Sequence, residues 1–197
     1  MSNPRIISGS ARGIRLQAVP GDITRPITDR VKEAVFNILS SDIVDAQFLD
    51  LFGGTGSVGI EALSRGASSA TFIDLHSQAT SVIKANLKTT HLETKATVHQ
   101  MDAFRYLSSP ATKKFDYVYI APPQYKQMWL MALHLVDDRM DWLADDGWVI
   151  VQIHPVELEE IKLDHLVEFD RRKYGSTVVL FYCPIESVFL LVKQKFP

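Results

Sequence analysis

The chain has 197 residues, of which 46% are hydrophobic and 22% charged, as is usual for a globular protein and unlike a disordered chain. This length fits one domain, or one domain with a small extension. A single cysteine, Cys183, excludes a disulfide framework and a cysteine-based zinc site, and no metal site is expected. The formal net charge of −2 excludes attraction of nucleic acid by the molecule as a whole, so such binding needs a local basic patch.

Neither a membrane helix nor a secretory signal is predicted. No apolar run approaches the roughly 18 residues that a membrane helix needs, and no long apolar segment follows the first residues of the chain. We therefore expect a cytoplasmic protein that binds no membrane, and we expect a monomer. The short chain also disfavours a dehydrogenase with a separate substrate domain.

The first 27 residues are predicted to form a basic N-terminal arm. Residues 1–35 carry six basic and three acidic side chains, whereas residues 137–170 carry two basic and eleven acidic ones, which is typical of a molecule with one cationic face. Apolar and polar side chains alternate from Ile14 to Ala18 after a turn with two glycines, as in a β-hairpin. We expect a hairpin with exposed arginines, and we place a larger domain at residues 28–197.

A helix and then an alternation of strands and helices are predicted after the arm. Thr28 is placed to cap a helix whose apolar residues recur at helical spacing up to Leu39 and which ends near Ser40. From residue 47 apolar strands alternate with helices, which predicts a parallel sheet covered on both faces. The predicted strands cover 48–52, 70–74, 96–101, 115–120 and 148–153, and the predicted helices cover 58–63, 77–92 and 128–136.

The last third of the chain predicts an antiparallel pair of strands at one edge of the sheet. Its two apolar stretches, 165–173 and 177–183, flank a turn sequence of Tyr, Gly and Ser. The final apolar stretch, 187–192, is either an added strand or a docking segment.

A glycine-rich loop carries the sharpest functional signal. Gly54, Gly56 and Gly59 follow the pattern G-x-G-x-x-G between a predicted strand and a predicted helix. Asp74 ends the next strand, where a ribose-binding acid belongs in a dinucleotide-type fold. The loop therefore predicts a nucleoside-type cofactor; the alternative is a tight turn that binds no ligand.

Asp50 indicates which nucleoside cofactor this loop binds. It lies three residues before Gly53, at the carboxyl end of the first strand, where its charge would repel a pyrophosphate. The same carboxylate suits a ligand with an amino or sulfonium group, so it favours S-adenosylmethionine over NAD. Asp102, at the end of the third strand, is placed to accept a hydrogen bond from the adenine amino group or to cap a helix at 103–107, and both roles are compatible.

Three stretches resemble one known family. Residues 5–9 (Arg-Ile-Ile-Ser-Gly) and 24–39 (Thr-Arg-Pro-Ile-Thr-Asp-Arg-Val-Lys-Glu-Ala-Val-Phe-Asn-Ile-Leu) resemble the N-terminal signature of the RsmD family, the bacterial 16S rRNA guanine-N2 methyltransferases, and residues 50–56 resemble its motif I. The resemblance runs from about residue 5 to residue 184. It implies a Rossmann-like class I methyltransferase fold, an α/β fold with a seven-stranded, mostly parallel sheet whose last strand is antiparallel. It also implies S-adenosylmethionine as cofactor, and 16S rRNA or a partly assembled small subunit as partner.

The resemblance also assigns roles around the cofactor. It implies Asp50 near the methionine part, Asp74 on the ribose and Asp102 on the adenine. The expected cofactor contacts are Asp50, Phe52, Gly53, Gly54, Thr55, Gly56, Asp74, Leu75, Asp102 and Ala103.

The catalytic motif departs from the family pattern. That pattern is Asp or Asn, then Pro-Pro, then Tyr or Phe, and this chain reads Ala121-Pro122-Pro123-Gln124-Tyr125. The exocyclic amine of guanine is a poor nucleophile because its lone pair is delocalised into the ring, and acceptors for its N–H groups make it reactive while an aromatic ring stacks on the extruded base. Ala121 offers no side-chain acceptor. We expect the carbonyl of Pro122, the amide of Gln124 and the ring of Tyr125 to rebuild the site in a shifted register.

RNA contacts are expected from two basic clusters. Phosphate contacts and a flipped base would bind the RNA. The expected residues are Arg5, Arg12, Arg15, Arg25 and Arg30 in the first cluster, and Arg171, Arg172 and Lys173 in the second. The alternative for the second cluster is a solvated turn at the edge of the sheet.

Three other functions stay open. Ala121 suggests a protein that binds cofactor and RNA but has lost activity. The same fold also accommodates a methyltransferase that acts on another amine, such as DNA adenine. An NAD-dependent oxidoreductase shares the glycine loop, but it conflicts with Asp50 and the chain lacks the second domain such an enzyme needs.

Overall fold

The computed structural model describes residues 3–20, 27–123 and 127–188. Its centre is a seven-stranded sheet in the order β3-β2-β1-β4-β5-β7-β6. β1 to β5 are parallel, and β7 runs antiparallel to both of its neighbours, β5 and β6. The strands are β1 (Gln47–Asp50), β2 (Ser69–Asp74), β3 (Ala96–Gln100), β4 (Phe115–Ile120), β5 (Leu143–Ile153), β6 (Leu166–Tyr174) and β7 (Thr177–Pro184).

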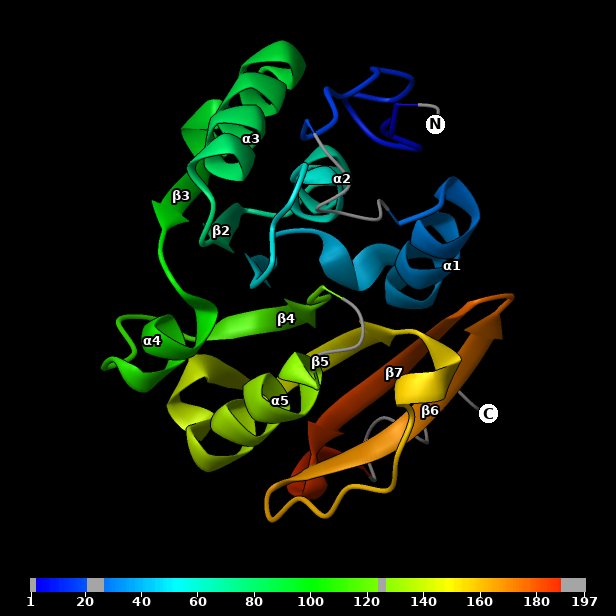
Figure 1. The fold of residues 1–197 in the computed structure, drawn as a ribbon, viewed down its shortest axis with the longest axis vertical. Helices are drawn as coiled ribbons and strands as arrows, with labels where there is room; N and C mark the ends of the chain where they lie inside the picture. Colours follow the sequence, from blue (N-terminus) through cyan, green and yellow to red (C-terminus); the bar gives the residue numbers. More distant parts are fainter. Residues whose placement is uncertain (1–2, 21–26, 124–126, 189–197) are drawn as a thin grey trace.

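Helices cover both faces of the sheet, which confirms the predicted fold class. Figure 1 shows α1, α2 and α3 with the N-terminal arm on one side of the sheet, and α4 and α5 on the other. Each side has its own apolar core, because successive strand residues point to opposite faces. The helices are α1 (Asp29–Leu39), α2 (Ser57–Ser64), α3 (Ser77–Thr90), α4 (Ala103–Ser108) and α5 (Met128–Asp138).

Most predicted boundaries are confirmed, and β5 is the clearest exception. The Thr28 hydroxyl accepts a hydrogen bond from the Val31 N–H at 3.3 Å and caps α1, as predicted. β5 begins at Leu143 and not at the predicted Trp148. The acidic segment between these residues belongs to the strand, because it forms a bulge where β5 pairs with β4. Sequence periodicity cannot reveal such a bulge, since the extra residues break the alternation on which the prediction depends.

The described part of the N-terminal arm, residues 3–20, folds back on itself through one antiparallel bridge between Arg5 and Arg15, without extended strands. The Ile6 N–H donates to the Ile14 carbonyl at 2.9 Å, and Gly9 and Gly13 have φ near +85°, which the turn requires. The arginines point to solvent, but the expected alternation ends early, because Ala18 is exposed and Val19 is buried.

Hydrogen bonds connect the arm to α2 along much of its length. The Glu61 carboxylate accepts hydrogen bonds from the N–H groups of Ile7 and Ser8, at 2.8 and 3.0 Å. The Ser64 carbonyl accepts one from the Ser10 N–H at 2.8 Å. Apolar residues of the arm share the core of α1 and α2, while the division at residue 27 stays a prediction.

The C-terminal stretch is only partly described. A 3-10 turn, Ile185–Ser187, follows β7, and the Ser187 hydroxyl donates to the Asp145 carbonyl at 2.6 Å. Residues 189–192 of the predicted apolar stretch lie outside the described residues.

Candidate functional site

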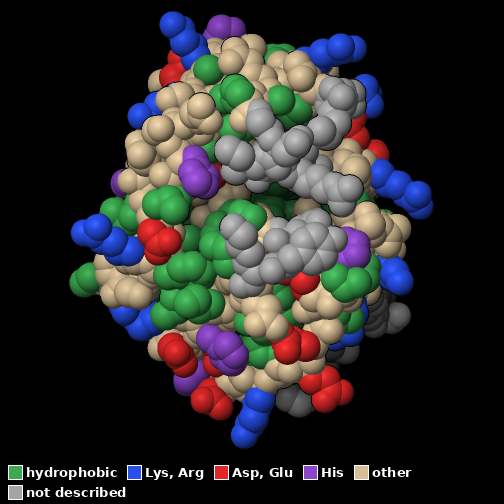
Figure 2. All heavy atoms as spheres, in the orientation of Figure 1, with side chains coloured by type: hydrophobic (Ala, Val, Ile, Leu, Met, Phe, Trp, Pro, Cys, Tyr) green, Lys and Arg blue, Asp and Glu red, His purple; other side chains and the backbone are tan. Residues whose placement is uncertain are grey.

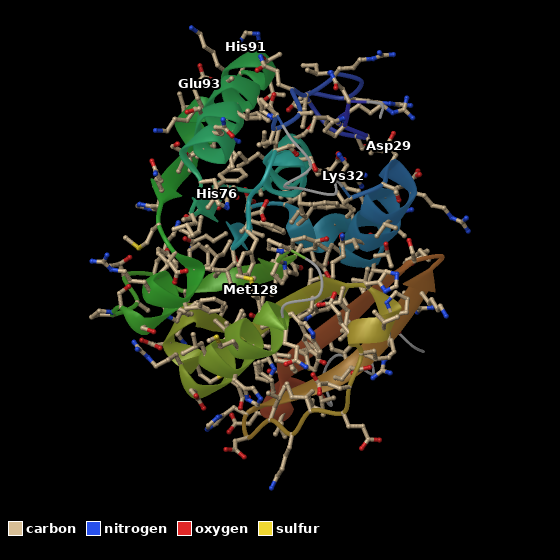
Figure 3. All side chains as sticks on the ribbon, in the orientation of Figure 1. Asp29, Lys32, His76, His91, Glu93 and Met128 are labelled. Atoms are coloured by element: carbon tan, nitrogen blue, oxygen red, sulfur yellow. The ribbon has the colours of Figure 1, made fainter. Side chains whose placement is uncertain are left out.

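The predicted cofactor residues gather at the carboxyl edge of the parallel strands. Asp50 ends β1, Asp74 ends β2 and Asp102 follows β3, and parallel strands present these ends at one edge. In Figure 1 the end of β4 meets the loop between β1 and α2 near the centre of the view, and Figure 2 shows the surface hollowed there. His76 and Met128, which precede or begin α3 and α5, lie on either side of that region in Figure 3.

The glycine loop has the geometry its sequence predicts. Gly54 and Gly56 adopt φ of +53° and +76°, which favours glycine, and Gly56 is the N-cap of α2. The Gly53 N–H donates to the Ile73 carbonyl at 2.9 Å, so the loop is tied to the end of β2. At Gly59 a side chain would lie 2.3 Å from the Phe72 ring. The third glycine therefore lets α2 pack closely on β2.

Asp50 is a buried carboxylate. It is 2% exposed and accepts a hydrogen bond from the Gly59 N–H at 3.2 Å. Across the described ranges no Lys or Arg forms an ion pair with it. Burial, opposed by the Gly59 hydrogen bond and reinforced by the nearby Asp74, raises its pKa to about 7. A positively charged ligand would suit such a group, because an opposite charge nearby favours the ionised form.

Asp74 connects the two loops that would enclose a cofactor. Its Oδ2 accepts a hydrogen bond from the Gly54 N–H and its Oδ1 accepts one from the His76 N–H, both at 2.9 Å. Each carboxylate oxygen can accept a further hydrogen bond, so the group still suits hydroxyl donors of a ribose. Leu75, between them, is 57% exposed. An exposed leucine beside a carboxylate offers an apolar surface to a flat ring.

Asp102 is the N-cap of α4, which confirms one of its two predicted roles. Its Oδ1 accepts a hydrogen bond from the Arg105 N–H at 2.9 Å. Ala103 is buried, and Phe52 meets Phe104 edge to face with ring centroids 6.2 Å apart. Sequence reasoning missed Phe104, although an aromatic residue directly after Asp102 and Ala103 was a signal for it. The adenine contact of Asp102 stays a prediction.

The predicted catalytic segment follows β4. Ala121 is half-buried against the core that contains α1, and Pro122 is half-buried. Gln124 and Tyr125 lie outside the described residues, so the shifted-register hypothesis stays a prediction. Sequence reasoning also missed Gln152, whose amide oxygen accepts a hydrogen bond from the Tyr119 hydroxyl at 2.5 Å, since the two residues are 33 positions apart.

The predicted RNA-binding arginines fall into two groups. Arg12, Arg15 and Arg30 are exposed and form no ion pair with a described residue, and Lys173 is exposed. Arg25 lies outside the described residues. The remaining arginines face acids, in the pairs Arg5–Asp29, Arg171–Glu168 and Arg172–Asp170, at 2.7, 2.7 and 2.9 Å. The second basic cluster is therefore partly neutralised by its own strand.

Comparisons with known proteins agree with this arrangement. Residues 4–183 match the family described as "Conserved hypothetical protein 95", and the chain is 37% identical over 148 residues to "Ribosomal RNA small subunit methyltransferase D" of Escherichia coli strain K12, covering 75% of this chain and 73% of that one. The chain belongs to this family, the RsmD family.

Further relatives of this RsmD-family protein cover almost its whole length. "Putative rRNA methyltransferase YlbH" of Bacillus subtilis strain 168 is 41% identical over 181 residues, covering 90% of this chain and 97% of its own. The solved structure of "Putative methyltransferase yhhF from Escherichia coli" superposes with a TM-score of 0.80 at 33% identity, covering 93% of this chain and 98% of that one. The RsmD-family chain thus has a Rossmann-like methyltransferase fold.

Among the described residues of this RsmD-family protein, none of the helices has the length and apolar character needed to cross a membrane.

Proposed function

We propose that this protein is an S-adenosylmethionine-dependent methyltransferase that methylates the exocyclic N2 amine of a guanine in 16S ribosomal RNA. The observation that carries the cofactor assignment is the buried Asp50 carboxylate, which has no cationic partner among the described residues and lies beside a glycine loop at the carboxyl edge of β1. The names of the curated relatives support the substrate, since they are called ribosomal RNA methyltransferases.

The residues at the sheet edge fit this cofactor better than a dinucleotide. Asp50 would hold the amino group of the methionine part, Asp74 the ribose hydroxyls and Asp102 the adenine amino group. When bound, the cofactor supplies a methyl group on a positively charged sulfur. A pyrophosphate beside Asp50 would instead meet a buried negative charge at close range. This argues against the NAD-dependent alternative.

The substrate side of the proposal depends on the arm and on the segment after β4. Exposed Arg12, Arg15 and Arg30 would contact phosphates, and the target guanine would leave its stack to reach the cofactor. The Pro122 carbonyl would accept one N–H of the amine. The proposed partner is 16S rRNA or a partly assembled small subunit.

The test is methyl transfer from labelled S-adenosylmethionine to small subunits and to naked 16S rRNA, both taken from cells in which the gene is deleted. We expect label in N2-methylguanosine, identified by mass spectrometry of the digested RNA, and at least about tenfold less transfer by Asp50→Asn when the cofactor is below its Kd. Label on another base would support the alternative amine substrate. Binding of cofactor and RNA without any transfer would support an inactive binding protein.

The inactive alternative has one specific observation in its favour, which is Ala121. A methyl side chain cannot accept a hydrogen bond from the amine. The same assay on Ala121→Asp separates the two functions. An inactive protein that becomes active through this substitution would have lost catalysis at this position alone.

A further inference from the structure

The side chains around Ala121 include a hydrogen-bond acceptor on the neighbouring strand. The Tyr119 hydroxyl, in β4, donates to the Oε1 of Gln152, in β5, at 2.5 Å. Gln152 is the second-last residue of β5, so it lies at the carboxyl edge where the glycine loop also lies. Both residues are therefore near the carboxyl ends of their strands, at the edge of the sheet where the proposed site lies.

Strand register places this pair beside Ala121. In the β4–β5 ladder Ile120 pairs with Val151, so Ala121 and Gln152 are the next neighbours along the two strands. Tyr119 pairs with Ile150 on one side and with Asp50 on the other. Because side chains alternate between faces with a period of two, Asp50, Tyr119, Ala121 and Gln152 share the face covered by α1 and α2.

The environment of Tyr119 makes it a fixed, neutral donor. The residue is 1% exposed, and its ring stacks on Phe48 with centroids 6.3 Å apart. Burial and the nearby Asp50 raise its pKa well above the ordinary value, so the phenol keeps its proton. Its hydroxyl proton is directed at Gln152, which orients the amide. The Gln152 side chain is half-buried and its oxygen keeps a second lone pair.

We propose that Gln152 is a catalytic residue that accepts a hydrogen bond from the N2 amine of the target guanine, in place of the side-chain acceptor that Ala121 lacks, and that Tyr119 is its positioning residue. This inference rests on the proposed function. In the reaction the N2 lone pair forms the bond to the methyl carbon, the electron pair of the carbon–sulfur bond goes to sulfur, and one N2 proton leaves to water. Gln152 accepts a hydrogen bond throughout and takes no proton.

The test compares Gln152→Met, which keeps the volume and removes the acceptor, with Gln47→Met at the amino end of β1 as a matched control. We expect Gln152→Met to lower kcat about 100-fold, as loss of one oriented polar group in other enzymes does, with the Kd for S-adenosylmethionine in calorimetry changed less than about threefold. We expect Tyr119→Phe to lower kcat about tenfold at unchanged KM for RNA, since it only frees the orientation of the amide. Gln47→Met should match the wild type in every readout.

A rescue variant separates this role from a structural one. Ala121→Asn in the Gln152→Met background restores an acceptor next to the lost one, and we expect it to recover at least about tenfold in kcat. Thermal unfolding of each variant shows whether the fold is intact, and recovery of kcat without a gain in thermal stability separates a restored acceptor from repaired packing.

The outcomes distinguish this inference from the function on which it rests. An active wild type whose Gln152→Met variant keeps full kcat overturns the role of Gln152 and leaves the proposed function standing. Failure of Ala121→Asn to recover activity in a folded variant also overturns it. A wild type that transfers no methyl group to guanine on any substrate overturns the proposed function, and this inference falls with it.

Discussion

Asp50 affects cofactor binding and folding in opposite directions. Burial raises the pKa of this carboxyl to about 7, from a value of 3.8 in an open chain. Between these two pH values the folded, cofactor-free protein holds a proton that the unfolded chain has lost. Its contribution to the free energy of unfolding is therefore full below pH 4 and declines as the pH rises towards 7. A cationic ligand reverses this preference because it favours the ionised form.

Asp50→Asn tests both effects in one protein. We expect the variant to bind S-adenosylmethionine at least about tenfold more weakly, and to be more stable without cofactor at pH 8 by roughly 1–3 kcal/mol, because the amide carries no buried charge. At pH 4 the two proteins should be equally stable. Urea unfolding at both pH values measures this, with exposed Asp146→Asn as the control. A stability difference independent of pH would show that Asp50 is ionised throughout.

The wild-type protein should also lose cofactor affinity as the pH falls below about 7. One proton must leave Asp50 for the cation to bind, so the Kd for S-adenosylmethionine should rise up to about tenfold per pH unit. Calorimetry at pH values from about 5.5 to about 8, a range that spans the expected pKa of Asp50, measures this change in Kd. Asp50→Asn should show a flat profile, and a flat profile in the wild type would contradict the raised pKa.

Gly59, the last glycine of the G-x-G-x-x-G pattern, allows a test of how closely α2 packs on β2. A methyl group there would lie 2.3 Å from Cε1 of Phe72, which is fully buried. We expect Gly59→Ala to cost about 2–4 kcal/mol in the free energy of unfolding, since neither the helix nor the ring can move freely. Gly175→Ala, at φ +58° in open space, tests backbone conformation alone and should cost about 1 kcal/mol. Equal costs would show that α2 can shift away from β2.

At the scale of elements, local sequence pattern predicted the strands and helices but not the side-chain contacts between them. Apolar segments and glycines predicted the bounds of β1, α2, β2 and β4 to within about two residues, because those signals are local. Lys32 looked like part of the cationic face, yet it is 1% exposed and pairs with Glu61 at 3.3 Å. Burial lowers its pKa although Glu61 raises it. A partner 29 residues away gives no sequence signal at either position.

Asn86 shows how such a connection joins the arm to the cofactor loop. This fully buried residue of α3 accepts a hydrogen bond from the Gln17 N–H at 2.7 Å and donates to the carbonyls of Gln17 and Thr55, at 3.1 and 2.8 Å. We expect Asn86→Ala to cost about 2–4 kcal/mol, because it leaves buried backbone groups unpaired. It should also weaken cofactor binding by loosening the loop. Exposed Thr89→Ala on the same helix is the control, and cofactor affinity unchanged in Asn86→Ala would show that the loop holds its shape alone.

At the scale of the whole molecule, the basic arm lies apart from the mixed-charge strand β6. In Figure 1 the N-terminal arm is at the top of the view, whereas β6, which carries Glu168 and Asp170 as well as Arg171, Arg172 and Lys173, runs across the lower half. Arg12 lies in the turn of the arm, beside the far end of α2 from the glycine loop, because the arm's Ser10 N–H bonds to Ser64. An RNA that contacts Arg12 and reaches the cofactor must therefore span at least the length of α2, which is itself buried.

Replacing Arg12 and Arg15 by alanine tests this path. Both side chains are exposed and unpaired among the described residues, so their loss should weaken RNA binding about tenfold while leaving the Kd for S-adenosylmethionine unchanged. Each lost phosphate contact should reduce the slope of log K against log salt by about 0.7–0.9. Titrations at several salt concentrations measure this, with Arg105→Ala on α4, across the sheet, as the matched control. An unaltered salt slope in the double variant would mean that the RNA approaches from another side, and that the arm only stabilises the packing around α2.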